Sequence, residues 1–387
     1  MDTVERDGAY IANTYARYGV VFARGKGARL WDTDGREYID FSSGIGVNSL
    51  GIADREWLTA VTQQAGRLAH ISNYFCNEPA AELAEMLCKR TGMERVFFAN
   101  SGAEANECAI KAARKYSSQK YGAGRGVVVT LTNSFHGRTA ATLSATGQED
   151  MHTYFYPFPQ GFVSVPANDL AALQAVFDNG DVCALMLECI QGEGGVIVLE
   201  KGYLKAAQKL CAQRDILFIC DEVQTGNGRT GTLYAYEQFG LKPDIVTTAK
   251  GLGGGLPIGA VLFNKKTQGV FTPGTHGSTF GGNPLCCAAA LSVLSRLDEY
   301  FLAAVRARGD FLRFELKKLP QVKELSGLGL MVGISVDGDA KQIAKACLNK
   351  GLVVLTAKDK IRLLPPLNIG MEELKEGVAR LKEALEK

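Results

Sequence analysis

A lysine and an aspartate each stand at the end of a strand-like apolar run. Lys250 lies in TTAKGLGGG, just after the run at residues 244–246, and Asp221 closes the run ILFICD. Because the carboxyl ends of parallel strands meet at the edge where α/β proteins bind ligands, we expect the two side chains to lie close together. A lysine amine can hold an aldehyde as a Schiff base, and a buried carboxylate can keep a ring nitrogen protonated. The pair therefore indicates a pyridoxal phosphate site.

For any single pair of this kind, the alternative is a surface lysine and a capping aspartate, because both residue types are mostly exposed in proteins. The choice depends on the surrounding motifs. Polar clusters follow five successive strand-like runs, at residues 100–107, 135–138, 188–195, 221–224 and 250. This alignment favours a shared site at one edge of the sheet.

Two segments could bind a phosphate group. Gly102 and Ala103 open a helix-like stretch, where small residues and free N–H groups let the backbone approach an anion. Ser-Gly before a helix is also common as a simple cap, so this motif alone is weak. Ser278 and Thr279 supply two hydroxyl groups in the run GSTFGGNP. The pattern GxxxxGK followed by Ser or Thr does not occur, which excludes a nucleotide-binding P-loop.

The run FHGR supplies an aromatic ring and a guanidinium group. Phe135 could stack on a pyridine ring, and Arg138 suits a bidentate contact with a carboxylate, although an isolated tetrapeptide of this kind could equally be a surface loop. We interpret His136 as a hydrogen-bonded structural histidine, because Lys250 can itself move a substrate proton. Gln224, shortly after the strand that ends at Asp221, could hydrogen-bond the hydroxyl group of the cofactor ring.

The composition is that of an ordinary globular protein. The 387 residues are 46% hydrophobic and 22% charged, with a formal net charge of +2 and interleaved acids and bases, so we expect no nucleic acid partner. No apolar run approaches the ~20 residues of a membrane span. Ten cysteines without repeated CxxC spacing predict reduced core residues, with no disulfide framework and no metal site. The acidic opening MDTVERDGAY shows no targeting segment, so we expect a cytoplasmic protein.

Strand-like runs alternate with helix-like stretches over most of the chain, which predicts an α/β fold with a mostly parallel sheet flanked by helices. The runs lie at residues 95–99, 126–131, 182–187, 216–220, 244–247 and 258–263, with helices at 103–116 and 203–213. A helical stretch at 284–319, short strands near 330–336 and 353–355, and a helix from Met371 predict a smaller α+β domain. We therefore predict a large cofactor-binding domain at 51–283, a small domain at 284–387, and an N-terminal segment at 1–50 that packs with the small domain and contains a hairpin at Asp34-Gly35.

The motifs SGAEANE, FHGRT, DEVQTGNGRTG, AKGLGGGLPIGA and GSTFGGNP occur in this order. Together they resemble the class III pyridoxal phosphate aminotransferases of fold type I, over nearly the whole chain. The resemblance implies a pyridoxal 5'-phosphate enzyme whose active unit is at least a homodimer. Two positions depart from the family pattern, Ser326 where arginine is usual and Asn227 where an apolar residue is common.

The resemblance also assigns roles in cofactor binding. It implies that Lys250 binds the cofactor covalently and shuttles a proton, and that Phe135 stacks on the ring. Asp221 and Gln224 would hold the ring nitrogen and hydroxyl, and Thr279 would reach the phosphate of the neighbouring subunit's cofactor. The implied cofactor-binding set is Gly102, Ala103, Phe135, Asp221, Glu222, Val223, Gln224, Lys250 and Thr279.

Substrate binding falls to four further residues by the same resemblance. Arg138 would grip the carboxylate at the far end of either substrate, and Arg362 would bind the α-carboxylate of glutamate. Glu193 would pair with Arg362 when an ω-amine is the donor, and Ser278 would reach the substrate across the dimer.

The implied reaction moves an amino group between N2-acetylornithine and 2-oxoglutarate, giving N-acetylglutamate 5-semialdehyde and glutamate, as in arginine biosynthesis. The alternatives within the class are enzymes acting on ornithine, succinylornithine, 4-aminobutyrate or another ω-amine. A glutamate-semialdehyde aminomutase is a further alternative, because those enzymes share the fold and the lysine.

Overall fold

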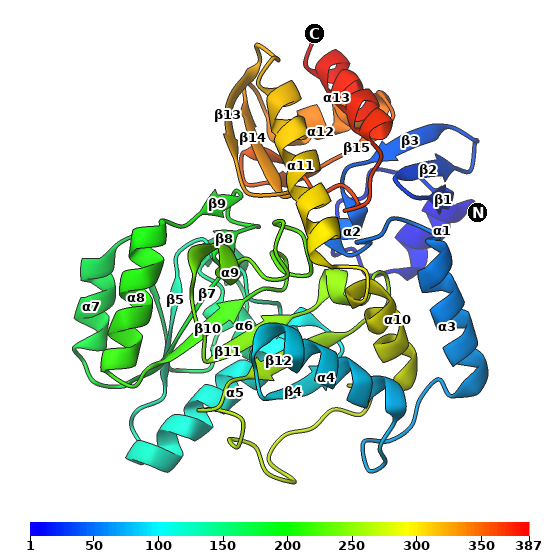
Figure 1. The fold of residues 1–387 in the computed structure, drawn as a ribbon. Helices are drawn as coiled ribbons and strands as arrows, with labels where there is room; N and C mark the ends of the chain where they lie inside the picture. The colour runs from blue at the N-terminus through cyan, green and yellow to red at the C-terminus, as the bar shows by residue number, and fades with distance from the viewer. Residues whose placement is uncertain (387) are drawn as a thin grey trace.

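A seven-stranded sheet lies at the centre of the larger part of the molecule, which the computed structural model describes over residues 1–386 (Figure 1). All six predicted strands are present, and the α/β class with a mostly parallel sheet is confirmed. The additional edge strand β6 is half exposed and lacks a continuous apolar run. In spatial order the strands are β4 (Arg95–Ala99), β12 (Gly259–Phe263), β11 (Ile245–Thr248), β10 (Leu217–Asp221), β7 (Val182–Leu187), β5 (Val127–Leu131) and β6 (Phe162–Val165).

One strand runs against the predicted direction. The run at 258–263 was expected to belong to the parallel set, but β12 is antiparallel to both β11 and β4. A crossover between parallel strands needs a dozen or more residues. The segment 249–258 is shorter than that, so the chain turns around Lys250 and returns directly beside β11. This short return keeps the lysine at the carboxyl edge of the sheet.

Helices cover both faces of the sheet. Helix α5 (Gly102–Tyr121) packs against β7, β11 and β12, and α8 (Lys201–Gln213) packs against β10. Within β10, Leu217 and Ile219 belong to the apolar cluster that includes α5, whereas Phe218 belongs to the cluster that includes α8. Burial on both faces explains the near-continuous apolar runs. The other helices of the larger part of the molecule are α3 (Arg55–Arg67), α4 (Glu78–Thr91), α6 (Ala140–Ala145), α7 (Leu170–Phe177), α9 (Tyr236–Phe239) and α10 (Pro284–Leu294).

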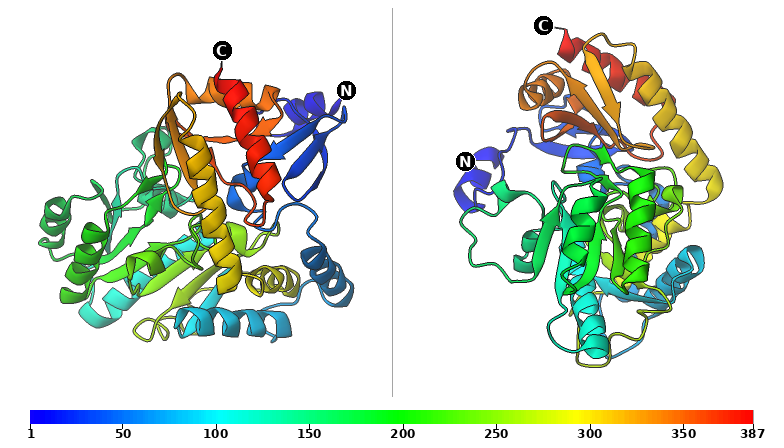
Figure 2. Two further views of the ribbon diagram at one scale, coloured as in Figure 1. Left: turned by 45° about the horizontal axis from the view of Figure 1, so that its top comes forward. Right: turned by 90° about the vertical axis from the view of Figure 1, so that its left-hand side faces the viewer.

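The N-terminal strands and the C-terminal quarter lie side by side above the large sheet (Figure 2). Strand β3 pairs with β15 in parallel, and the hairpin predicted at Asp34-Gly35 joins β2 to β3. The first sheet contains β1 (Phe22–Lys26), β2 (Arg29–Asp32), β3 (Glu37–Asp40) and β15 (Leu352–Val353), and the second contains β13 (Val322–Ser326), β14 (Val332–Val336), β17 (Lys360–Leu363) and β16 (Leu355–Ala357). Helices α12 (Ala340–Asn349) and α13 (Met371–Leu385), with the short elements α1 (Thr3–Tyr10), α2 (Ser43–Gly46), β8 (Ile190–Gln191) and β9 (Ile197–Val198), complete the fold.

The helical stretch predicted at 284–319 is two helices. Helix α10 ends at Leu294 and α11 runs over Glu299–Leu316. The break comes from Asp298, whose side chain accepts a hydrogen bond from the Phe301 N–H and so caps a new helix. Figure 1 shows that α11 then continues along the smaller sheets, away from the large one.

Two expectations concern the chain as a whole. The predicted domain boundaries, after residues 50 and 283, stay a prediction. In the part of the chain that the structure describes, each helix is too short or too polar to span a bilayer.

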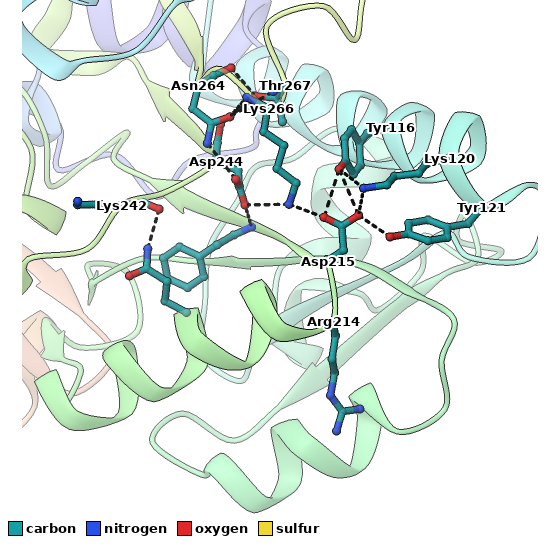
Figure 3. A network of polar contacts seen from close by, with 12 residues as sticks. Tyr116, Lys120, Tyr121, Arg214, Asp215, Lys242, Asp244, Asn264, Lys266 and Thr267 are labelled. Carbon is teal, nitrogen blue, oxygen red and sulfur yellow. Dashed lines mark hydrogen bonds and ion pairs between the residues drawn. The ribbon is translucent and has the colours of Figure 1, made fainter.

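A network of charged and phenolic groups lies at the amino end of β10, opposite the end that carries Asp221 (Figure 3). The Asp215 carboxylate accepts hydrogen bonds from Tyr116 and Tyr121 of α5 and pairs with Lys120 at 2.8 Å and with Lys266 at 2.8 Å. Partial burial alone would raise the pKa of Asp215, but the two lysines hold it below its usual range. The network ties α5 to the sheet at the end remote from the polar clusters.

Candidate active site

A cavity of about 480 Å³ opens at the carboxyl edge of the large sheet. Its size falls in the range of small-molecule sites, about 300–1,000 Å³. Segments that follow β4, β5, β7, β10 and β11 line it, as the alignment of polar clusters predicted. Of the predicted residues, those in its lining are Gly102, Ala103, Phe135, Arg138, Asp221, Val223, Gln224 and Lys250.

Lys250 follows β11 by two residues and begins a short 3₁₀ turn. Its backbone is left-handed, with φ +45°, a conformation that L-residues rarely adopt. Burial lowers the pKa of its amine. A larger fraction of the amine is therefore neutral, which is the form that can attack a carbonyl carbon.

Asp221 ends β10 and is 3% exposed. Its Oδ2 accepts hydrogen bonds from Asn106 Nδ2 and His136 Nδ1, each at 2.8 Å, and its Oδ1 accepts the Val223 N–H at 3.0 Å. Burial disfavours the charged form of His136, but the adjacent Asp221 carboxylate raises its pKa overall. The Asp221 carboxylate is thus fixed in direction.

The hydrogen bond from His136 fits the structural role predicted for that residue, but Asn106 was missed. Asn106 lies on the buried side of α5, between alanine and cysteine residues of the same face. A polar residue on an otherwise apolar helix face was the available signal, since buried polar groups need partners.

Glu188 was also missed as an individual residue. It follows β7, is buried, and accepts the Phe135 N–H at 3.0 Å and the Gly192 N–H at 3.4 Å. Burial raises its pKa to about 7. Its carboxyl group joins the loop that carries Phe135 to the loop that carries Glu193.

The amino end of α5 forms one wall of the cavity. Ser101 caps the helix by accepting the Glu104 N–H at 3.1 Å, and the first N–H groups have no partner within the helix. A Cβ atom at Gly102 would lie 2.6 Å from Val223 Cγ1, so only glycine fits there. The first N–H groups of α5 can bind an anion at this wall of the cavity.

Two arginines stand in different electrostatic surroundings. Arg362, on β17, is buried and donates hydrogen bonds to Glu193 Oε1 at 2.6 Å and to Gln224 Oε1 at 2.9 Å. The pKa of Glu193 is lowered, because its contact with Arg362 outweighs the effect of burial. Arg138 is exposed, lies 5.6 Å above the Phe135 ring, and has no ion-pair partner among residues 1–386.

Five of the predicted residues are outside the cavity lining, and two of them, Glu193 and Arg362, are connected to it through hydrogen bonds with Gln224. The other three lie away from the cavity. The Glu222 carboxylate is turned into the protein, where it accepts hydrogen bonds from Thr225 Oγ1 and the N–H groups of Ala235 and Tyr236, so its position does not support cofactor contact. Ser278 and Thr279 lie on a separate surface loop, and Ser278 Oγ accepts a hydrogen bond from Asn100 Nδ2 at 3.2 Å.

The cavity fits the size and chemistry of pyridoxal phosphate. An amine, a fixed carboxylate, an aromatic ring and an open helix end surround one space. Asn106 Oδ1 and His136 Nε2 are buried there without a hydrogen-bond partner in the described residues, which leaves polar capacity for a ligand. Residues 1–386 contain no group of three or more His, Cys, Asp or Glu side chains that could hold a metal ion.

Comparisons with known proteins agree with this geometry. The family described as "Aminotransferase class-III" matches residues 10–385. An acetylornithine aminotransferase from Haemophilus ducreyi is 54% identical over 381 residues, covering 98% of this chain and 97% of that protein. Among solved structures, N-acetylornithine aminotransferase from Stenotrophomonas maltophilia is 39% identical, with a TM-score of 0.87 and coverage of 99% and 98% of the two chains. Ornithine aminotransferase from Toxoplasma gondii has a TM-score of 0.94 at 35% identity, with 99% and 94% covered.

Proposed function

The chain belongs to the class III aminotransferases, and on that premise we propose that it moves an amino group between N2-acetylornithine and 2-oxoglutarate. The products are N-acetylglutamate 5-semialdehyde and glutamate. The enzyme depends on pyridoxal 5'-phosphate. When bound, this cofactor supplies an aldehyde that takes up the amino group and a ring that accepts electrons from the substrate.

We propose Lys250 as the covalent anchor of the cofactor and as the base that moves the proton at the reacting carbon of the substrate. Asp221 would hold the ring nitrogen protonated, with Asn106 and His136 fixing its carboxylate. Gly102 and Ala103 would bind the phosphate at the end of α5, and Phe135 and Val223 would contact the ring. Gln224 would bind the ring hydroxyl.

The observation that carries the substrate proposal is the contrast between the two arginines. Each substrate has a carboxylate far from its reacting carbon, and the unpaired Arg138 can bind it in both half-reactions. Glutamate has a second carboxylate beside its amine, whereas the ω-amine of acetylornithine has none. Glu193 neutralises Arg362 when no carboxylate is present and must release it when glutamate binds. One site can then accept both donors.

A second cavity, of about 310 Å³, supports an acylated donor. It shares Arg138 with the Lys250 cavity and is otherwise lined by Ala140, Leu143, Phe155, Pro157 and Phe158. A ligand whose α-carboxylate binds Arg138 would direct its α-substituent toward these apolar groups. An acetyl group suits them, whereas the free α-ammonium of ornithine would lose its hydration without a carboxylate partner.

We also propose a homodimer with shared active sites. The loop with Ser278 and Thr279 lies outside the Lys250 cavity of its own chain, and Phe280 beside it is 59% exposed. Tyr74 and Phe75 add exposed aromatic surface, and Tyr74 lines a cavity together with this loop. Covering this surface with a second copy would bring both hydroxyl groups to a neighbouring site.

All ten cysteines are free, which supports a reducing, cytoplasmic location.

The test is a panel of amines offered to the purified protein with pyridoxal phosphate and 2-oxoglutarate, with glutamate as the measured product. We expect acetylornithine to exceed ornithine, succinylornithine and 4-aminobutyrate in kcat/KM. Lys250→Arg should reduce glutamate formation by a factor on the order of 10³ or more, because it removes the proton carrier. Equal rates on ornithine and acetylornithine would overturn the substrate assignment.

An aminomutase is distinguished in the same assay. It moves the amino group within one molecule and needs no external keto acid. Turnover of acetylornithine without added 2-oxoglutarate would contradict the proposed transfer between two substrates.

A further inference from the structure

The backbone around Lys250 is held in a conformation that it would not adopt alone. Lys250 has φ +45°, and the preceding Ala249 has φ −165° and ψ −143°, so the chain makes an abrupt turn directly after β11. For a lysine, the left-handed region is sterically unfavourable and persists only where neighbouring groups impose it. The groups that impose it control where the amine points.

Asn227 contacts this turn from the loop that follows β10. It is 1% exposed and is itself left-handed, with φ +55°, a conformation that asparagine tolerates better than most residues. Its Nδ2 donates one hydrogen bond to Thr248 Oγ1 at 2.9 Å and another to the Ala249 carbonyl oxygen at 3.1 Å. Both hydrogens of the side-chain amide are therefore directed at the end of β11.

The bond to Ala249 acts directly on the lysine. Because the peptide unit is planar, fixing the Ala249 carbonyl also fixes the N–H of Lys250. With that plane set, φ of Lys250 determines the direction in which its side chain leaves the backbone. Asn227 thus orients the lysine without contacting its amine.

Two other side chains hold the following carbonyl groups. Ser49 Oγ donates to the Gly251 carbonyl at 3.0 Å, and Trp57 Nε1 donates to the Gly253 carbonyl at 3.0 Å. Alternate carbonyls of the turn are thus bound by donors from distant parts of the chain. The Ala249 carbonyl, on the peptide that precedes Lys250, accepts the Leu252 N–H of the turn itself at 3.0 Å, and among the side chains of residues 1–386 only Asn227 donates to it.

The unused end of the Asn227 side chain indicates why an amide stands there. Its Oδ1 is buried and has no hydrogen-bond partner in the described part of the chain. A buried acceptor without a partner destabilises the folded state, so packing alone would favour an apolar side chain at this position. The two donated bonds are the contribution that an apolar residue could not make.

We propose that Asn227 is a positioning residue that sets the direction of Lys250 through the Ala249 carbonyl. The inference rests on the proposed covalent role of Lys250. Removing the donor should relax the turn, move the amine away from the position that receives the cofactor aldehyde, and weaken cofactor binding.

Two variants isolate the donor. Asn227→Gly keeps the left-handed backbone accessible and deletes the side chain, whereas Asn227→Asp keeps the shape and replaces the donating nitrogen with oxygen. Asn168→Gly is the matched control, because Asn168 is also left-handed, with φ +62°, and its side chain bonds only the Glu200 N–H at 3.0 Å, on the surface. Any general effect of placing glycine at a left-handed asparagine appears in this control.

The measurements are the dissociation constant of pyridoxal phosphate, obtained by titrating the full-length apoprotein, and the pH dependence with which an amine-selective reagent modifies Lys250, followed by mass spectrometry. We expect both Asn227 variants to weaken cofactor binding by about tenfold relative to Asn168→Gly, the factor for one lost buried hydrogen bond. The apparent pKa of Lys250 should rise, because the relaxed amine leaves the buried position that lowers it.

The proposal is overturned if both Asn227 variants match the control in cofactor affinity and in the pH dependence of Lys250 modification. It is also overturned if their affinity falls only in proportion to a general loss of thermal stability. Failure of the proposed function looks different: the unmodified protein would then bind no cofactor at Lys250 at all.

Discussion

Replacing Glu188 with glutamine should make the protein less sensitive to rising pH. Glu188 is buried between the loops that carry Phe135 and Glu193, and burial raises its pKa from an ordinary 4.5 to about 7. Its folded-state pKa is therefore above its unfolded value. Between these two pH values the folded state binds more protons than the unfolded state, so stability falls as pH rises.

The size of the effect follows from the difference between the two pKa values. A rise from 4.5 to about 7 corresponds to about 3 kcal/mol of stability, which is present below the unfolded pKa and lost above the folded pKa. Glutamine has one acceptor in place of two, and the weaker 3.4 Å bond from the Gly192 N–H is the one it should lose. That loss costs about 1 kcal/mol at every pH and does not change the slope.

Denaturant unfolding of both proteins from about pH 5 to about pH 8, the window around the two pKa values, tests this reasoning. Both proteins contain His136, whose raised pKa also makes stability fall as pH rises. The quantity to compare is therefore the difference in the free energy of unfolding between the variant and the wild-type protein at each pH. We expect that difference to move in favour of Glu188→Gln by about 2–3 kcal/mol across the window. Two parallel stability curves would refute the assignment of Glu188 as a buried, protonated acid.

Two substitutions test the substrate and phosphate ends of the site. Glu193→Gln should raise the ratio of glutamate to acetylornithine turnover by about tenfold, or about 1.4 kcal/mol, because Arg362 would lose the negative charge that it is paired with. The measurement is a kinetic assay of both half-reactions, and an unchanged ratio would exclude a gating role. Gly102→Ala would place a Cβ atom 2.6 Å from Val223 Cγ1, and the overpacking of about 1–3 kcal/mol should displace the end of α5 and weaken cofactor binding in an equilibrium titration. Gly202→Ala is its control, since an added Cβ there meets nothing within 4 Å.

The arrangement of the site was readable from the sequence because it depends on local order along the chain. Each polar cluster directly follows an apolar run, and a mostly parallel sheet brings the ends of such runs to one edge. Lys250, Asp221 and Gln224 were placed in this way, and all three line one cavity. The strand direction of β12 could not be read in the same manner, because its apolar run looks alike in either orientation.

The partners of those residues depend on contacts between distant segments. Asn106 reaches Asp221 from a helix 115 positions away, and Glu188 bonds Phe135 across 53 positions. A polar residue in a helix or after a strand gives no local sign of which distant group it will meet. Such pairs become visible only when side-chain geometry shows which buried donors and acceptors satisfy one another.

The pairing of Glu193 with Arg362 depends on how the loop that carries Glu193 meets the sheet that contains β17. Val196 follows Glu193 in this loop and is left-handed, with φ +54°, which is unusual for a β-branched residue. The side chain of Val196 packs on Gly333, where an added Cβ atom would come within 2.9 Å of it, and Gly333 is the direct partner of Arg362 in the β14–β17 ladder. Val196 therefore packs the loop that carries Glu193 against the strand pair that carries Arg362. The proposed release of Arg362 by Glu193 would then need only rotation of the Glu193 side chain, with the backbone on both sides in place.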